Sequence, residues 1–234
     1  MRLLLRVIPL CVTLPTIVAD PIIVITAVPW WHVVIEATVA VGTIGAALVA
    51  LFGEAFRAKF FPPRLTIQLA DVLGEAARVS IPSPGGGAPS VGDARFYHLR
   101  VRNTRPWSPA RDVRVVVLRV EEPGPDGRLQ IRWTGDIPLG WRHGNVLPFL
   151  RVVGPDTYAD LCSVVRGKWL QLLMLIVPSV LELPKSEATN MVVSVQAQAT
   201  ETTSNILRVR ISWDGGFDTG AQEMRRHTTV EEVD

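Results

Sequence analysis

The chain has 234 residues, which is room for one ordinary domain and an appendage. Its 24 basic and 22 acidic side chains nearly balance, so the net charge of +2 does not identify a class of partner. Only two cysteines occur, Cys11 in the apolar N-terminal region and Cys162 far beyond it, which excludes a disulfide framework.

The N-terminal region is unusually apolar. Residues 7–29 follow Arg2 and Arg6, carry one acidic residue and are interrupted by four prolines. Three interpretations stay open: a first membrane span that forms a two-helix hairpin with the next segment, a signal-like segment ending near Ala19, or a proline-bent segment lying in the membrane interface.

Residues 33–53 form a second apolar run that only Glu36 interrupts. As a helix it would cover roughly 30 Å, the thickness of one hydrocarbon core. It lacks the polar stripe of a buried core helix, so the pattern favours a membrane span. Arg57, Lys59 and Arg64 follow it, and basic residues beside a span tend to stay in the cytoplasm. We therefore expect residues 1–60 to be an inner-membrane anchor, with one span or a two-helix hairpin, and the remainder to be cytoplasmic.

Small residues recur at intervals of four in this predicted span, namely Thr38, Gly42, Ala46 and Ala50. They share one helix face, and small residues at this spacing let helix backbones approach closely. We expect this face to pack on the first apolar segment or on a second copy of the chain. The alternative is that alanine and glycine are simply common in membrane helices.

From Leu65 onward the hydrophobic pattern alternates with a period of two, which is typical of antiparallel strands with one buried face. The pattern predicts strands in residues 64–73, 95–103, 111–122, 157–165, 168–177, 190–200 and 206–213, and another near Ile131. Asp-Gly in EEPGPDGRLQ favours a hairpin between the strands around Val117 and Ile131. Residues 82–93, PSPGGGAPSVGD, predict a flexible loop. Residues 61–234 are therefore expected to form a β-sandwich domain.

One stretch of this domain has a familiar pattern. A strand carrying Tyr97, Leu99, Val101 and Asn103 leads through a short loop to Ala110 and Val113. This resembles the immunoglobulin/fibronectin-like sandwich modules of bacterial surface and membrane proteins, although the glycine that often follows the asparagine is absent.

The resemblance extends to most of the chain. Through GTIGAALVALFGE, FFPPRL, DLCSVV, KWL and ISWDG, the sequence is similar to uncharacterised bacterial membrane-anchored proteins with one such domain. It implies a mainly β, immunoglobulin-like fold behind a membrane anchor, and it implies no activity.

No catalytic, cofactor-binding or metal-binding residue is predicted. Cys162 would need His98, His143 or His227 as a base to act as a nucleophile, and none lies at a diagnostic spacing. A lone strand cysteine is more often a small buried hydrophobic residue. Calcium binding at loop tips is considered for four carboxylates, those of Asp156, Asp160, Asp214 and Asp218. Acidic residues dispersed in loops more often belong to ordinary solvated turns.

Seven arginines fall within residues 95–119, where Asp112 is the only acidic residue. If the strands 95–103 and 111–122 pair, Arg100 and Arg102 share a solvent-facing side and Arg114 joins them. Such a face would attract anionic lipid headgroups, nucleic acid or an acidic partner. The alternative is a solvated face whose arginines pair with carboxylates elsewhere.

These patterns favour a membrane-tethered, cytoplasm-facing interaction or scaffold module without catalytic activity or cofactor. Its expected partners are the membrane and another protein, with self-association through the span as an option and nucleic acid disfavoured. The alternatives are a membrane-associated, hydrolase-like enzyme with a site assembled from loops, and an anion-binding module that uses the arginine face. Within the domain, Trp213 continues the inward series Leu207, Val209 and Ile211, so we expect it to be a core residue.

Overall fold

The computed structural model describes residues 29–81, 86, 88–142, 150–153 and 156–234. The first apolar segment of the sequence, residues 7–29, lies outside the described residues except for Pro29. His143 also lies outside them. The chain divides into two compact units, Met1–Leu51 and Phe52–Asp234.

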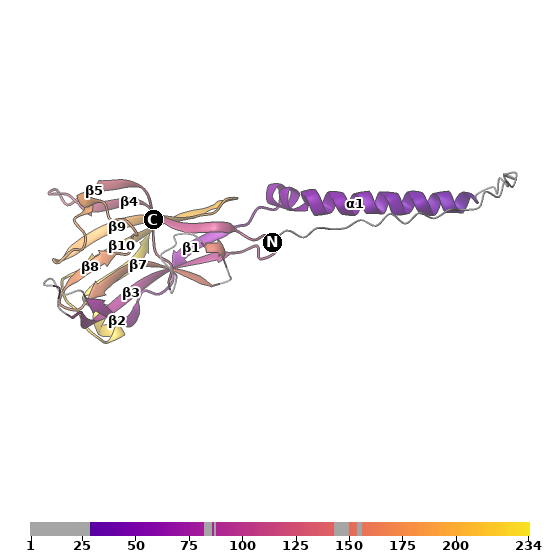
Figure 1. Cartoon of the computed structure of the whole chain (residues 1–234). Helices are drawn as coiled ribbons and strands as arrows, with labels where there is room; N and C mark the ends of the chain where they lie inside the picture. The colour runs from indigo at the N-terminus through magenta and orange to yellow at the C-terminus, as the bar shows by residue number, and fades with distance from the viewer. Residues whose placement is uncertain (1–28, 82–85, 87, 143–149, 154–155) are drawn as a thin grey trace, which may run out of the picture. The chain divides into compact units, whose positions relative to one another are not determined.

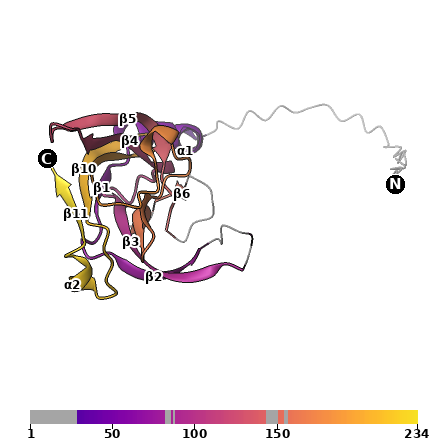
Figure 2. The ribbon, with the colours of Figure 1, turned by 90° about the vertical axis from the view of Figure 1, so that its left-hand side faces the viewer.

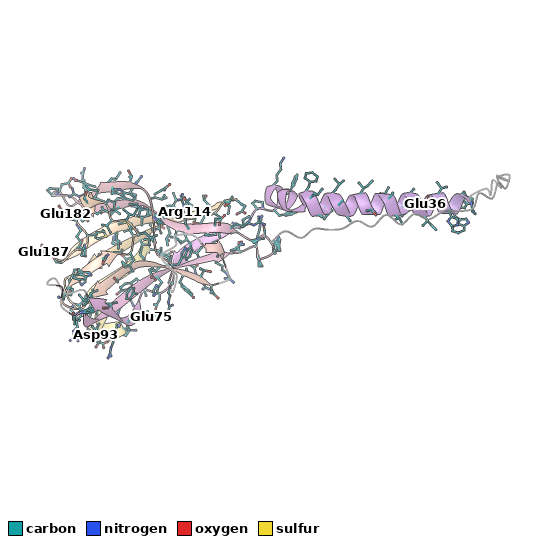
Figure 3. All side chains as sticks on the ribbon, in the orientation of Figure 1. Glu36, Glu75, Asp93, Arg114, Glu182 and Glu187 are labelled. Atoms are coloured by element: carbon teal, nitrogen blue, oxygen red, sulfur yellow. The ribbon has the colours of Figure 1, made fainter. Side chains whose placement is uncertain are left out.

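The predicted span is a helix. Helix α1 (Trp30–Phe60) contains a 24-residue apolar stretch, Trp30–Gly53, none of which is buried. Glu36, labelled in Figure 3, is the only charged side chain in that stretch. The helix is long and apolar enough to cross a bilayer, and its place near the N-terminus is consistent with a membrane anchor or a signal sequence.

The rest of the chain is mainly β and forms two antiparallel sheets (Figures 1 and 2). The first sheet has the order β1-β3-β7-β8, with β2 also paired to β3. Its strands are β1 (Leu65–Leu69), β2 (Glu75–Ile81), β3 (Ser90–Asn103), β7 (Thr157–Val165) and β8 (Trp169–Leu172).

The second sheet has the order β11-β10-β9-β4-β5, with β6 also paired to β4. Its strands are β4 (Arg111–Pro123), β5 (Leu129–Pro138), β6 (Leu150–Val152), β9 (Thr189–Gln198), β10 (Thr203–Trp213) and β11 (Thr228–Val233). Two short helices, η1 (Ser179–Leu181) and α2 (Ala221–Met224), follow β8 and β10.

One hydrophobic core lies between the sheets. The first sheet contributes residues such as Leu99 and Leu161, and the second contributes residues such as Val115, Val193 and Ile211. This matches the alternating pattern, because every second side chain of a strand points to the same face. Trp213 also belongs to the core, and its indole N–H donates to the Gly216 carbonyl at 2.7 Å.

One condition considered from the sequence is not met in this domain, and one expectation is wrong in part. Strands β3 and β4 do not pair, since they belong to different sheets, so the short connection between them crosses from one sheet to the other. Within the predicted loop 82–93, residues 90–93 belong to β3 and pair with the end of β2. Strand β2 was not predicted, because its sequence EAARVSI is exposed on both faces over most of its length and shows little alternation.

The chain changes sheet a second time after β5. The Leu139 N–H donates to the Val115 carbonyl in the second sheet at 2.8 Å. Three residues later, the Arg142 N–H donates to the Tyr158 carbonyl in the first sheet at 3.0 Å. This crossover places the Arg142 side chain on the outer face of the first sheet.

A β-bulge in β7 changes the strand register next to Arg142, on the outer face of the first sheet. Tyr97 pairs with Cys162, but the next residue of β3, His98, pairs with Asp160, so Leu161 is the additional residue. Leu161 and Cys162 both enter the core. Asp160 is thereby placed opposite His98 on the outer face.

Candidate functional site

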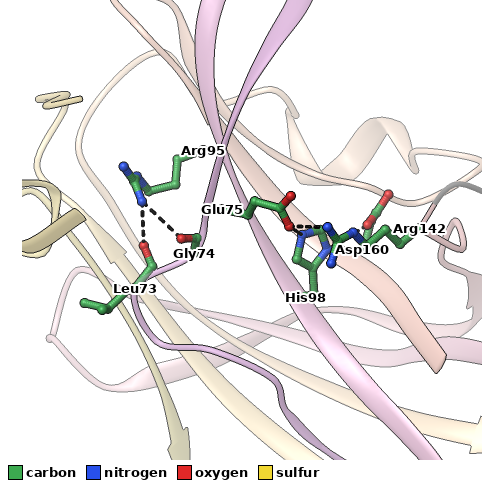
Figure 4. Close-up of polar contacts among 7 residues, drawn as sticks. All are labelled: Leu73, Gly74, Glu75, Arg95, His98, Arg142 and Asp160. Atoms are coloured by element: carbon green, nitrogen blue, oxygen red, sulfur yellow. Dashed lines mark hydrogen bonds and ion pairs between the residues drawn. The ribbon is translucent and has the colours of Figure 1, made fainter. Parts of the chain in front are cut away.

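A recess that combines charged and apolar side chains lies on the outer face of the first sheet, where four separate parts of the chain meet (Figure 4). Its volume is about 190 Å³. Its lining residues are Glu75 and Ala77 of β2, Phe96 and His98 of β3, Asp160 of β7 and Arg142 of the crossover.

His98 is at the centre of this recess and is only 8% exposed. Its Nδ1 lies 2.8 Å from Asp160 Oδ1, a hydrogen-bonding distance. Its Nε2 lies 3.5 Å from Glu75 Oε2, which also receives Arg142 Nη2 at 2.5 Å. The ring of Phe96 lies nearly parallel to the imidazole.

These contacts define what the recess can do. Asp160 orients the imidazole through Nδ1, which is how a carboxylate holds a histidine in one tautomer. Nε2 is buried beside Glu75 Oε2 and makes no hydrogen bond among the described residues, so its hydrogen-bonding capacity is unused there. The recess combines two carboxylates with a guanidinium and therefore presents both signs of charge within a small volume.

Arg95, also shown in Figure 4, has a structural role. Its side chain is buried, and Nη1 donates to the carbonyls of Leu73 and Gly74 at 3.0 Å each. Nη2 donates to the Thr219 carbonyl at 2.7 Å. Arg95 thereby joins the β1–β2 turn to the segment that follows β10.

The possible nucleophile, Cys162, is fully buried in the core. Burial raises the pKa of its thiol far above the ordinary value, so the reactive thiolate is disfavoured. His98 lies on the opposite face of the sheet, and His227 is engaged with Asp214 at 3.0 Å. Neither histidine is placed to activate this thiol.

The three arginines of the predicted basic face are distributed over both sheets. Arg100 forms an ion pair with Asp156, and Arg102 is exposed two residues further along β3. Arg114, labelled in Figure 3, belongs to β4, and its Nε donates to Gln198 Oε1 at 3.1 Å. Pairing of β3 with β4 was the condition for placing Arg114 beside Arg100 and Arg102. These two strands do not pair.

The remaining candidate residues have the following positions. Thr38, Gly42, Ala46 and Ala50 lie on exposed α1, and among the described residues no neighbour lies within 4 Å of where a side chain at Gly42 would begin. The four carboxylates considered for calcium have protein partners: Asp156 contacts Arg100, Asp160 contacts His98, Asp214 contacts His227, and Asp218 accepts from the Gly220 N–H. Within the described residues, no group of three or more metal-binding side chains is placed to hold an ion.

Alternation along β3 puts His98 on the face opposite Tyr97 and Leu99, but it does not identify the residues that surround His98. Glu75 belongs to a strand that was not predicted, and Arg142 follows a change of sheet that has no local pattern. The bulge that aligns Asp160 with His98 likewise has no sequence signal that we can identify.

Compared with known proteins, the chain matches no protein-family model and no curated protein. The similarity to membrane-anchored sandwich proteins is therefore supported only in architecture, by an apolar N-terminal helix followed by two antiparallel sheets.

Proposed function

We propose that this protein is a membrane-tethered binding module, in which α1 anchors the chain and the β domain binds another protein without catalysis. The observation that carries the proposal is the apolar stretch Trp30–Gly53, none of which is buried, joined directly to a domain that has its own core. A bilayer would remove this apolar surface from water. An anchor of this kind raises the effective concentration of the domain for partners at the same membrane.

An immunoglobulin-like arrangement of the domain is part of this proposal. The strand orders β1-β3-β7 and β10-β9-β4-β5 correspond to the orders A-B-E and G-F-C-C′ of an immunoglobulin sandwich. Strand β8 departs from that scheme, since it follows β7 in sequence whereas the D strand precedes E. Modules of this architecture commonly present binding surfaces without catalytic groups.

The proposed location is the inner membrane, with the β domain in the cytoplasm. Its support is the cluster of Arg57, Lys59 and Arg64 directly after the apolar stretch. The proposed contact with the partner is the recess around His98, whose mixed charges suit a polar or zwitterionic group of a protein.

Site-specific photocrosslinking in native membranes tests this function. A photoreactive amino acid replaces Ala77, which lines the recess, and a matched probe replaces the exposed Leu129 of β5 in the other sheet. We expect a defined protein adduct from position 77, none of the same size from position 129, and retention of the chain in membranes after carbonate washing. Release of the chain by carbonate, or identical adducts from both positions, would contradict the proposal.

A second candidate function is a hydrolase-like enzyme, favoured by the His98–Asp160 contact and by an Nε2 that makes no hydrogen bond among the described residues. In such an enzyme, His98 would act as a general base toward water bound in the recess. Turnover of a simple ester by the full-length protein, abolished in His98→Gln, would favour this candidate over the binding module. The anion-binding alternative has less support, because Arg100 is already paired and Arg114 lies in the other sheet.

A further inference from the structure

We propose that residues 104–109, here named the Trp107 loop, form a second membrane contact that inserts Trp107 into the headgroup region of the bilayer. The proposal rests on the proposed function, because it requires α1 to be a membrane anchor. It adds a specific surface of the β domain and a specific partner, an anionic lipid surface.

The Trp107 loop is bound to the segment of chain that leaves α1. The Arg64 N–H donates to Asn103 Oδ1 at 3.2 Å, and the Thr104 N–H donates back to the Arg64 carbonyl at 2.8 Å. Arg105 Nη1 donates to the Pro62 carbonyl at 3.0 Å. The loop therefore stays beside residues 62–64 wherever the anchor holds them.

Hydrogen bonds within the Trp107 loop and to Asn103 also fix its conformation. Asn103 Nδ2 donates to the Ser108 carbonyl at 2.7 Å, and Asn103 Oδ1 accepts from the Arg105 N–H at 3.0 Å. The Ser108 N–H donates to the Arg105 carbonyl at 2.9 Å. Ser108 is buried, whereas Trp107, between two prolines, is 62% exposed. The fold thus presents an indole outward on a fixed turn, although it buries Trp141 and Trp213.

The length of α1 sets how far this loop can lie from a bilayer. Seven helical residues beyond Gly53 add about 10 Å, and each interfacial layer is roughly 5–8 Å thick. Pro62 is two residues past the end of α1, which adds at most about 7 Å. Pro62 therefore lies at most about 17 Å beyond the hydrocarbon core, so the loop bonded to Pro62 and Arg64 is held within about 10 Å of the lipid headgroups.

The exposed side chains of this region match the chemistry of that layer. Phe60, Phe61 and Trp107 are large and exposed, and Lys59 and Arg64 are exposed cations among them. Tryptophan favours the membrane interface because its ring is apolar and its N–H is polar. Basic side chains near the surface are attracted to anionic lipids. This combination favours a lipid surface as the occupant over a second protein.

Depth-dependent fluorescence quenching tests the proposal with the full-length chain. Trp107→Cys is labelled with a small fluorophore in a Cys11→Ser background, where the fully buried Cys162 does not react in the folded protein. The chain is reconstituted into phosphatidylcholine–phosphatidylglycerol vesicles, with or without lipids that carry a nitroxide near the headgroup. Matched labels are placed at Ile44 in α1 and at Asp126, in the turn at the opposite end of β4 from the Trp107 loop.

We expect nitroxide lipids to reduce the fluorescence of the labels at positions 44 and 107 and to leave the label at position 126 unchanged. Quenching at position 44 but not at 107 would overturn the second contact while leaving the anchor intact. Absence of quenching at position 44 would overturn the anchor itself, and with it both proposals. A third outcome is that the label at position 107 is protected from an aqueous quencher but is not quenched by nitroxide lipids. This would indicate a protein contact and would also overturn the lipid contact.

Discussion

The Asp214 carboxylate contacts two groups at the end of strand β10. It follows β10 directly, and its Oδ1 accepts from the Gly216 N–H at 2.7 Å while Oδ2 lies 3.0 Å from His227 Nδ1. The hydrogen bond from Gly216, and next the contact with His227, hold the pKa of Asp214 below its ordinary value of 3.8. A carboxyl with a lowered folded-state pKa stabilises the fold above its unfolded-state pKa, and this stabilisation is lost as the pH falls through the folded-state value.

The first prediction concerns this pH dependence. Asp214→Asn should lower the melting temperature at neutral pH, and the difference from the parent protein should shrink as the pH falls below about 4. His227→Gln, which leaves the bond from Gly216 in place, should show a smaller difference of the same kind. Thermal denaturation followed by circular dichroism over a series of pH values measures both. A difference that stays constant down to the lowest pH would rule out an ionised Asp214 as its source.

For single residues, the sequence predicts whether a side chain is buried better than it predicts which side chains it contacts. The alternation around Trp213 predicts that its ring is buried, and the ring is 4% exposed with its N–H on a loop carbonyl. The partners of His98 were not predictable in the same way, because they come from β2, β7 and the crossover after β5. Alternation within one strand carries no information about which strand lies beside it.

The second prediction concerns strand β10 as an element. Trp213→Ala should destabilise the domain by roughly 3–5 kcal/mol, because it removes a large side chain from the core. Trp107→Ala removes an equally large side chain from the surface and should change the stability by less than about 0.5 kcal/mol. Denaturant unfolding of the two variants measures the difference. Equal stabilities would mean that the register assigned to β10 is wrong.

Among the elements, strands with a clear apolar alternation were predictable, even at a sheet edge such as β1, whereas strands without one were not. Strands β1, β3, β9 and β10 alternate clearly, and all four are present. Strand β2 lacks the apolar series, since its exposed edge position does not require one. The pairing of β3 with β7 rather than β4 depends on the closure of the whole core, which no local pattern encodes.

The third prediction concerns the orientation of the whole molecule. A reporter fused after Asp234 that is active only outside the cytoplasm should remain inactive, whereas one that matures in the cytoplasm should be active. Replacing Arg57, Lys59 and Arg64 together by glutamine should weaken this preference, because basic residues beside a span retain their side in the cytoplasm. Strong activity of the first reporter in the parent protein would reverse the proposed topology.

The position of β1 has a consequence for how the molecule is made. On the side away from β3, the Ile67 N–H and carbonyl bond to the side chain of Asn205, and the Leu69 N–H donates to Glu232 Oε1 at 2.6 Å. During synthesis, β1 leaves the ribosome before these partners exist, since Asn205 follows Ile67 by 138 residues and Glu232 follows Leu69 by 163. A nascent chain paused before Asn205 would expose this whole edge of β1, and one paused before Glu232 would still leave the Leu69 N–H without its side-chain acceptor.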